Sequence, residues 1–355
     1  YAPWHDWENI AKNGPLAIIH AGILAANAHN TQPWRFTINA DHIVLHADYA
    51  RNLGSFDPYY RELTLSLGCA LENMAHAAAA QGYVANVVTE SGQLTLRNEA
   101  PATSPVARIY LEAGPKQCSP LYVAIGQRHT HRGRYETDKK IANDLVGEML
   151  QLNSDASGVS LYIYDSGQQK NEIGELTIDA TRQITADQTM SHDSARWFRL
   201  DRQSIDQFRD GVTIDAFALP APINAIAKLA PTPNIKDGDK HWLQATRDVH
   251  VASASLFGVI SVSDLYDRQL TLNAGRLWQR LHLWATTQHI AAQPLNQIPE
   301  LIDREAQLGK PPNTQAHFSK ITGHPTTRPT FIFRMGYAET AARLSPRRGI
   351  DSVID

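Results

Sequence analysis

The stretch Ala25–Phe36, which reads Ala-Ala-Asn-Ala-His-Asn-Thr-Gln-Pro-Trp-Arg-Phe, decides how the rest of the chain is interpreted. It concentrates side-chain amides and small residues, and Pro33 fixes a turn before a strand-like run. The preceding residues, 15–28, carry Ile19 and Ile23 at helical spacing. We therefore expect a ligand-binding corner between a helix and a strand.

A second polar stretch about a hundred residues later reads Arg-His-Thr-His-Arg over residues 128–132. A short helix expected over residues 120–127 leads directly into it. Near the end of the chain, Ser345–Arg348 adds a further pair of arginines. Clustered guanidiniums bind phosphate through bidentate, charge-assisted hydrogen bonds. These stretches predict an anionic ligand.

The two stretches together resemble the nitroreductase superfamily, in which a small-polar run with Asn-x-Gln-Pro-Trp and an Arg-x-Ser-x-Arg clamp grip FMN. The resemblance implies one non-covalently bound FMN. It implies that Arg128, Thr130 and Arg132 bind the phosphate and the pyrimidine edge of FMN, and that the C-terminal arginines also bind the phosphate. The small-polar run departs from the Pro-Ser-Ser of the family, since residues 26–28 are Ala-Asn-Ala. The implied cofactor-binding residues are Asn27, His29, Asn30, Gln32, Arg128, His129, Thr130, Arg132, Gly275, Arg276, Arg347 and Arg348.

Gly275 and Arg276 belong to this set because relatives bring a backbone N–H from the corresponding region near the reactive flavin nitrogen. A glycine permits such a close backbone approach. No catalytic side chain is implied, since the flavin carries the redox chemistry.

The chain carries only one copy of each motif, which resembles the fused, Acg-like FMN-binding subgroup of mycobacteria and other bacteria. The resemblance implies an α+β fold of two nitroreductase-like halves in an intrachain pseudo-dimer. We expect the halves at 1–118 and 119–355, with a lid insertion at about 186–240 that includes a proline-rich run, Pro220–Pro233.

Periodicity predicts the order of elements along the chain. Strands are expected at 34–38 and 43–47 as one hairpin, at 84–88 and 93–96 as a second, and at 107–111, 159–164, 256–262 and 329–334. Helices are expected at 59–81, capped by Gly82, and at 141–152, 170–184, 243–254 and 268–291.

The resemblance leaves three functions open. The first is an FMN-dependent oxidoreductase that passes electrons from NAD(P)H or another donor to a nitroaromatic, quinone or similar acceptor. The second is an FMN-sequestering or storage protein with a closed lid. The third is a flavin-consuming reaction. Absence of a Gly-x-Gly-x-x-Gly turn favours FMN over a dinucleotide.

Composition excludes several other classes. The 355 residues are 43% hydrophobic and 19% charged, with a net charge of −3, which gives no reason to expect nucleic acid as a partner. No window reaches the roughly 18 apolar residues of a membrane span. The 15 histidines lack a zinc-binding pattern, and we expect no metal. Cys69 and Cys118 are expected to be unpaired. We expect a soluble protein that is either cytoplasmic or exported after removal of an N-terminal segment, and the compartment stays open.

Several residues have structural alternatives. Asp48, Arg51, Asp57 and Arg61 are expected to form an ion-pair network rather than a catalytic group. The alternative for the arginine stretches is a solvated helix end or a solvated tail, whose surface ion pairs contribute little to stability. The aromatic pair at 197–198 could be a lid over the flavin or a packing anchor.

Overall fold

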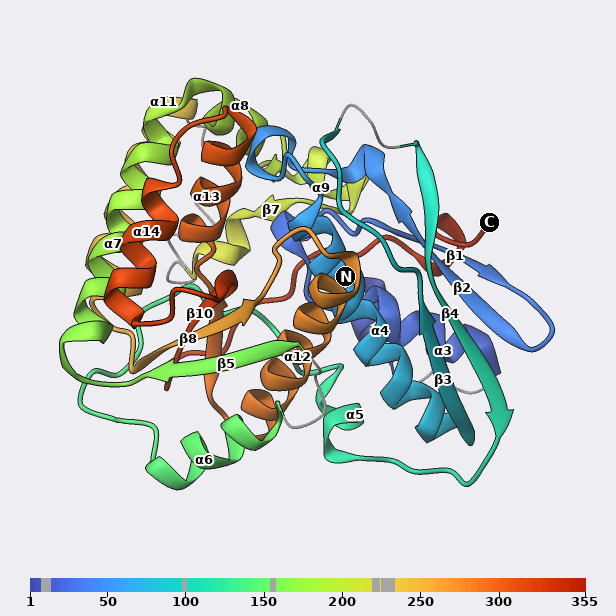
Figure 1. The fold of residues 1–355 in the computed structure, drawn as a ribbon. Helices are drawn as coiled ribbons and strands as arrows, with labels where there is room; N and C mark the ends of the chain where they lie inside the picture. Colours follow the sequence, from blue (N-terminus) through green and yellow to red (C-terminus); the bar gives the residue numbers. More distant parts are fainter. Residues whose placement is uncertain (8–13, 98–100, 154–157, 219–223, 225–233) are drawn as a thin grey trace.

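Two four-stranded antiparallel sheets form the framework of the protein (Figure 1). The computed structural model describes residues 1–7, 14–97, 101–153, 158–218, 224 and 234–355. The first sheet has the order β1-β2-β4-β3 and the second the order β5-β8-β10-β9. Mixed helix and sheet confirm the predicted α+β class.

The first sheet contains β1 (Trp34–Ile38), β2 (His42–Asp48), β3 (Tyr83–Thr89) and β4 (Thr103–Ala113). The β1–β2 hairpin is confirmed, with Trp34 opposite Ala47. The hairpin predicted for 84–88 and 93–96 is wrong, because β3 pairs with β4. The backbone of Leu94 instead donates to Tyr266 of the second half, at 2.6 Å.

The end of the chain covers the open edge of this first sheet. The Phe36 N–H donates to the Val353 carbonyl at 2.8 Å, and the Asp355 N–H donates to the Phe36 carbonyl at 2.9 Å. This pairing satisfies backbone groups that an edge strand would otherwise expose. It also carries the residues around Arg347 next to the Ala25–Phe36 stretch.

The second sheet contains β5 (Val159–Tyr164), β8 (Leu256–Val262), β9 (Ala291–Pro294) and β10 (Arg328–Gly336). All residues of β8 are buried, as its continuous apolar run predicts. The helix predicted at 268–291 ends at Thr287, so that residues 291–294 can form β9 beside β10.

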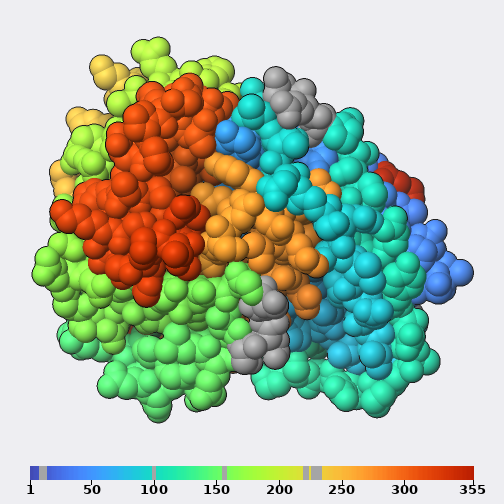
Figure 2. Space-filling view, viewed as in Figure 1, coloured from blue at the N-terminus to red at the C-terminus, as the bar shows by residue number. Residues whose placement is uncertain are grey.

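Two long helices, α4 (Arg61–Gln81) and α12 (Arg268–Thr287), cross between the sheets. Two glycines allow their backbones to meet. A Cβ at Gly68 would lie 2.2 Å from the Leu272 carbonyl oxygen, and one at Gly275 would lie 2.1 Å from that of Leu65. In Figure 2 the orange residues of the α12 region lie between blue and teal residues on one side and green and red residues on the other. The predicted cap of α4 at Gly82 is confirmed by its left-handed φ of 85°.

Further helices surround this centre, and five of those described, α1, α8, α9, α13 and α14, were not predicted. The predicted helix at 243–254 is replaced by the end of α11 and a π-helical turn, η6 (Thr246–Val251). The remaining helices are α1 (Ala2–His5), α3 (Gly14–Ile23), α5 (Pro120–Ala124), α6 (Asn143–Gln151), α7 (Gly167–Ala186), α8 (Gln188–Ala195), α9 (Arg202–Phe208), α11 (Ile235–Ala245), α13 (Gln297–Gln307) and α14 (Asn313–Thr322).

The segment predicted as an insertion contains α8, α9, the small parallel strands β6 (Phe198–Arg199) and β7 (Val212–Thr213), and the turn η5 (Ile214–Phe217). It packs on the first half, where the Trp197 indole N–H donates to the Asn52 carbonyl at 3.1 Å. Of its proline-rich run, Pro220, Pro222, Pro231 and Pro233 lie outside the described residues.

Both cysteines are unpaired, as predicted, with Cys69 buried and Cys118 exposed. Across the described ranges, no helix combines the length and the apolarity that crossing a bilayer demands.

Candidate functional site

The residues that follow α3 adopt an unusual backbone. His29, Asn30 and Gln32 have left-handed φ angles of 45°, 54° and 53°. This region is costly for side-chain-bearing residues, although asparagine and histidine tolerate it better than most. Local hydrogen bonds offset the cost. The Asn27 side-chain oxygen accepts from the Gln32 N–H at 2.8 Å, and the Ala28 N–H donates to the Ser66 hydroxyl at 3.0 Å.

This strained turn is fastened to the insertion. The Gly211 N–H donates to the Asn30 carbonyl at 3.0 Å, while the Asn30 side-chain amide donates back to the Gly211 carbonyl at 3.1 Å. The Gln32 amide donates to the Arg209 carbonyl at 2.9 Å. Gly211 is required here, since its φ is +75° and a Cβ would lie 2.3 Å from the Trp197 carbonyl oxygen. The insertion therefore forms part of the site.

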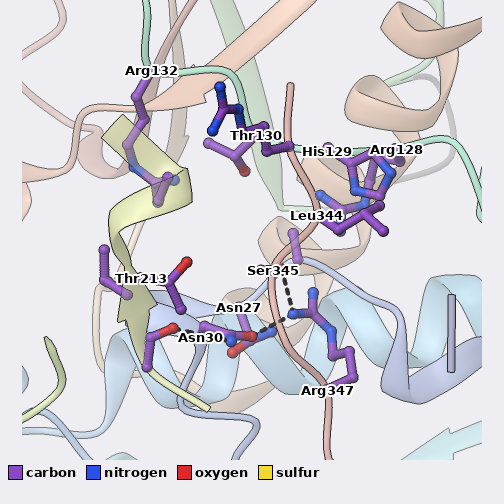
Figure 3. Close-up of a pocket in the computed structure, with 15 residues that line it drawn as sticks. Asn27, Asn30, Arg128, His129, Thr130, Arg132, Thr213, Leu344, Ser345 and Arg347 are labelled. Atoms are coloured by element: carbon purple, nitrogen blue, oxygen red, sulfur yellow. Dashed lines mark hydrogen bonds between the residues drawn. The ribbon is translucent and has the colours of Figure 1, made fainter. Parts of the chain in front are cut away.

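A small cavity lies where these segments meet (Figure 3). Its volume is about 50 Å³, well below the roughly 300 Å³ or more of typical small-molecule pockets. Four separate parts of the chain contribute its walls. The lining residues are Ala26, Asn27, Asn30, Arg128, His129, Thr130, Arg132, Gly211, Val212, Thr213, Ala216, Arg343, Leu344, Ser345 and Arg347.

Three arginines around the cavity form no ion pair with any carboxylate among the described residues. Arg128 and Arg347 are 2% and 3% exposed, and Arg132 is partly exposed. Figure 3 shows the three on different sides of the cavity. Burial lowers the pKa of Arg128 and of Arg132 to about 10, and burial together with the Arg128 charge lowers the pKa of Arg347 well below its usual value. The two pKa values of about 10 leave Arg128 and Arg132 charged at neutral pH, and an arginine side chain such as Arg347 keeps its proton in proteins.

Backbone carbonyls and neutral side chains satisfy only part of these guanidiniums. Arg128 donates to the Leu24 carbonyl at 3.0 Å, and Arg347 donates to the Ser345 hydroxyl at 2.7 Å and to the Asn30 side-chain oxygen. The buried Nε atoms of Arg128 and Arg347 have no partner. Buried donors without partners are costly, and charged ones more so. The arrangement fits a multivalent anion such as a phosphate monoester.

The fourth arginine that lines the cavity differs. Arg343 lies 3.3 Å from the Asp215 carboxylate, so an ion pair already partners it. Arg343, Thr213 and Ala216 were not predicted as site residues. The insertion has no recognisable motif, and Arg343 stands in an unremarkable polar sequence, so no sequence signal pointed to them.

The two histidines predicted in the site have neutral rings. Burial, and then the Arg132 charge, lowers the pKa of His29 to about 4, and burial with Arg128 and Arg347 lowers the pKa of His129 to about 3. The His29 ring lies 3.1 Å from the Ser194 hydroxyl and does not line the cavity. His129 lines it, together with Asn27, Asn30 and Thr130.

Two further predicted residues lie beside the cavity without lining it. Gln32 is fully buried, and its side-chain oxygen accepts from the Arg348 N–H at 2.8 Å. The Arg348 guanidinium donates to the Ser352 carbonyl at 3.3 Å. Both residues fasten the C-terminal segment to the strained turn. The structure places their side chains in support of the site rather than at its surface.

Gly275 and Arg276 are not among the lining residues. Gly275 lies at the crossing of α4 and α12, where its close approach is to the backbone of Leu65. Arg276 lies 3.0 Å from the buried Glu72, which Arg280 also contacts at 2.7 Å. Helix packing and this ion-pair cluster account for both residues in the described structure.

The predicted ion-pair network is present only in part. Asp57 accepts the backbone N–H groups of Glu62 and Leu63, each at 2.9 Å, and Arg61 pairs with Asp303 at 2.7 Å. Arg51 pairs instead with Asp210 of the insertion. These groups hold elements together, in agreement with the structural interpretation.

Comparison with known proteins leads to nitroreductases. No family model matches the chain. The chain is 37% identical over 70 residues to "Putative NAD(P)H nitroreductase Rv3131" of Mycobacterium tuberculosis, an alignment that covers 20% of each protein. The match therefore spans a fifth of the length of this curated relative.

Solved structures of nitroreductases show a distant likeness. The FMN-dependent nitroreductase NfnB from Mycobacterium smegmatis, in complex with NADPH, is 17% identical with a TM-score of 0.41, over 66% of this chain and 96% of that one. A nitroreductase with bound FMN from Desulfitobacterium hafniense is 12% identical with a TM-score of 0.40, over 67% and 98%.

Proposed function

We propose that the protein is an FMN-dependent oxidoreductase of nitroreductase type. The observation that carries the proposal is the cavity surrounded by Arg128, Arg132 and Arg347, three cations without a carboxylate partner in the described structure. Guanidiniums buried in this way are stabilised by an anionic ligand. The nitroreductase resemblance of the motifs makes the FMN phosphate the favoured anion.

The cavity offers the classes of donor and acceptor that FMN requires. Arg128, Arg132 and Arg347 would hold the phosphate and polarise the pyrimidine edge, while Asn27 and Asn30 would meet hydroxyl and ring-edge groups. When bound, FMN would supply the hydride and electron transfer. The two partly buried histidines stay neutral and therefore add no positive charge to that of the arginines.

NAD(P)H is the proposed donor, and a nitroaromatic, a quinone or a similar compound is the proposed acceptor. The 70-residue likeness to a protein named as an NAD(P)H nitroreductase supports the donor. The chain itself has no catalytic acid or base in this proposal.

We also propose that the two sheets mark two nitroreductase-like halves, 1–118 and 119–355, in an intrachain pseudo-dimer of the Acg-like type. Each half contains one four-stranded antiparallel sheet and one of the two helices that cross at the centre, α4 and α12, which supports this division. The tail at 353–355 crosses back to the first sheet, so the second half contributes a segment to the first.

An absorbance spectrum of the purified protein, followed by anaerobic addition of NADPH, tests the enzyme proposal. We expect flavin bands, in the protein as purified or after reconstitution with FMN, that NADPH bleaches promptly. A protein without flavin bands even after reconstitution would contradict the proposal. Bands that only dithionite bleaches would support the second candidate instead.

The second candidate is an FMN-sequestering protein, and the closed insertion favours it. Asp210, 4% exposed, pairs with both Arg51 and Arg199, and the Arg199 contact measures 2.9 Å. The neighbouring residues 211–213 line the cavity. A volume of about 50 Å³ requires this segment to move before a flavin can enter.

Replacement of the insertion carboxylate tests sequestration. Asp210→Asn should weaken both ion pairs and accelerate FMN association and release, which stopped-flow flavin fluorescence would measure. Asp206→Asn is the matched control, because Asp206 forms only an exposed pair with Arg202. If NADPH oxidation rises together with the exchange rates in Asp210→Asn, closure restrains turnover. Rates equal to those of the control would exclude this carboxylate as the restraint.

A further inference from the structure

The N-terminal helix α1 brings an aromatic ring to the cavity arginines. Trp4 is 6% exposed and is not among the lining residues, yet it contacts four of them, one being His129, whose ring centroid lies 4.6 Å from that of Trp4. Its ring centroid lies 4.9 Å from the Arg347 guanidinium carbon and 6.0 Å from that of Arg128. Its indole N–H donates to the Ser345 carbonyl at 2.8 Å. One side chain therefore joins the two arginine stretches.

Trp4 is held in place by its own segment. The Pro3 carbonyl accepts from the His20 ring at 2.8 Å. Trp7 packs against Tyr122 at a centroid distance of 5.3 Å, and a Cβ at Gly126 would lie 2.6 Å from its ring. These contacts anchor the helix on both sides of Trp4, so the ring position is defined.

The physical role of the ring follows from the charges that it faces. Arg128 and Arg347 are both buried, and each raises the cost of the other's charge. The face of an indole attracts a cation by about 0.5–2 kcal/mol, and more strongly when water is excluded. A carboxylate would neutralise the arginines and compete with an anionic ligand. An aromatic face stabilises them and leaves their charge available.

We propose that Trp4 is a positioning residue of the anion site: its ring holds the Arg128 and Arg347 guanidiniums in place of a carboxylate and keeps both ready for the phosphate of the ligand. This inference rests on the proposed binding of FMN. Trp4 does not line the cavity and acts through the two arginines.

The test compares FMN with riboflavin, which lacks the phosphate, in flavin-fluorescence titrations. In Trp4→Leu the preference for FMN over riboflavin should fall about ten-fold, because a cation–π contact of this size is lost. Trp4→Phe, which keeps an aromatic face, should recover most of it. Trp7→Leu is the control, because it removes from the same segment a buried indole that contacts neither arginine. This variant should keep the preference for FMN within about two-fold of wild type.

Site-specific fluorination of Trp4 tests the same point without a change of size, and it serves if Trp4→Leu does not fold. Each added fluorine weakens the negative ring face, so the preference for FMN should fall stepwise along the series. An unchanged preference for FMN in Trp4→Leu or along the fluorinated series would overturn only the role of Trp4, and the proposed function would stand. A wild-type protein that binds neither flavin would overturn the proposed function, and this inference with it.

Discussion

The protein buries two clusters of charge that solve the same problem in opposite ways. Around Arg61, four carboxylates come together: Asp57, Glu62, Glu300 and Asp303. Most of their groups find partners within the cluster or its neighbours, as in the 3.1 Å bond from the Tyr266 hydroxyl to Asp303. Around the cavity, three arginines share no carboxylate in the described structure and leave buried donors open.

The difference lies in which groups can shed their charge. Burial raises the pKa of Asp57 to about 6 and that of Glu62 to about 7, so protons can neutralise the excess acid. Arginine retains its proton at neutral pH even with a pKa near 10. The acidic cluster can therefore lower its own charge by binding protons, whereas the cationic cluster requires an anion from outside. This contrast separates a structural cluster from a binding site.

The largest expected effect breaks the acidic cluster. Arg61→Ala should lower the free energy of unfolding by about 3–5 kcal/mol, because it leaves buried carboxylates without their cation. Urea unfolding measures the change. Arg182→Ala, which removes an exposed pair with Asp179, should cost less than about 1 kcal/mol. Equal losses in the two variants would contradict the structural role of the cluster.

Removal of an arginine from the cavity cluster should have the opposite pattern, a loss of ligand affinity with little loss of stability. Arg128→Leu should weaken FMN binding by about 1.5–3 kcal/mol, or ten-fold and more, because charge-assisted hydrogen bonds are lost. The free energy of unfolding of the flavin-free protein should fall by less than about 1 kcal/mol or rise, since an unpaired buried cation is removed. Flavin titration and urea unfolding measure the two quantities. An unchanged dissociation constant would mean that Arg128 does not hold the ligand.

The pH dependence of stability sharpens the comparison. Glu62 has a folded-state pKa of about 7, raised by burial, so the folded protein binds more protons than the unfolded one between about pH 4.5 and 7, and stability falls as the pH rises through this window. Glu62→Gln should reduce this loss, to which Asp57 with its pKa of about 6 also contributes, and above pH 7 the variant should gain about 1–3 kcal/mol relative to wild type, with little gain at pH 4.5.

Glu72→Gln on the same helix is the control of opposite sign. Glu72 is buried too, but hydrogen bonding from His76 and the charges of Arg280 and Arg276 hold its pKa well below the usual range. This variant should be less stable than wild type at neutral pH and approach it only in acid. Urea unfolding from pH 4.5 to 8 measures how the free energy of unfolding depends on pH. If this dependence is the same for Glu62→Gln and wild type, Glu62 does not titrate in this window.

The smallest effect concerns the glycine at the helix crossing. Gly275→Ala should destabilise the fold by about 1–2 kcal/mol, because the added Cβ meets the Leu65 carbonyl oxygen. FMN affinity should change little. Gly238→Ala on the surface of α11, where a Cβ meets nothing within 4 Å, should be neutral or slightly stabilising. Loss of FMN affinity without loss of stability would restore the flavin role predicted for Gly275.

Sequence patterns anticipated much of the framework. The β1–β2 hairpin, the buried strand β8 and the cap at Gly82 follow from local periodicity and turn chemistry. The pairing of β3 with β4 does not, because it depends on a partner that local patterns do not specify. In the site, the motifs identified Arg128, Arg132 and Arg347, which the structure brings together, but not Arg343. The contribution of residues 211–216 and the ring of Trp4 arise from tertiary contacts, which leave no local pattern.

The most direct test of the cationic cavity is an equilibrium titration of the flavin-free protein with FMN and with riboflavin, at low and at high salt. The carboxylate-free arginines predict tighter binding of FMN by at least about ten-fold, with a preference that salt reduces. Failure to bind either flavin, or equal affinity for both at every salt concentration, would contradict the assignment of these arginines to an anionic ligand.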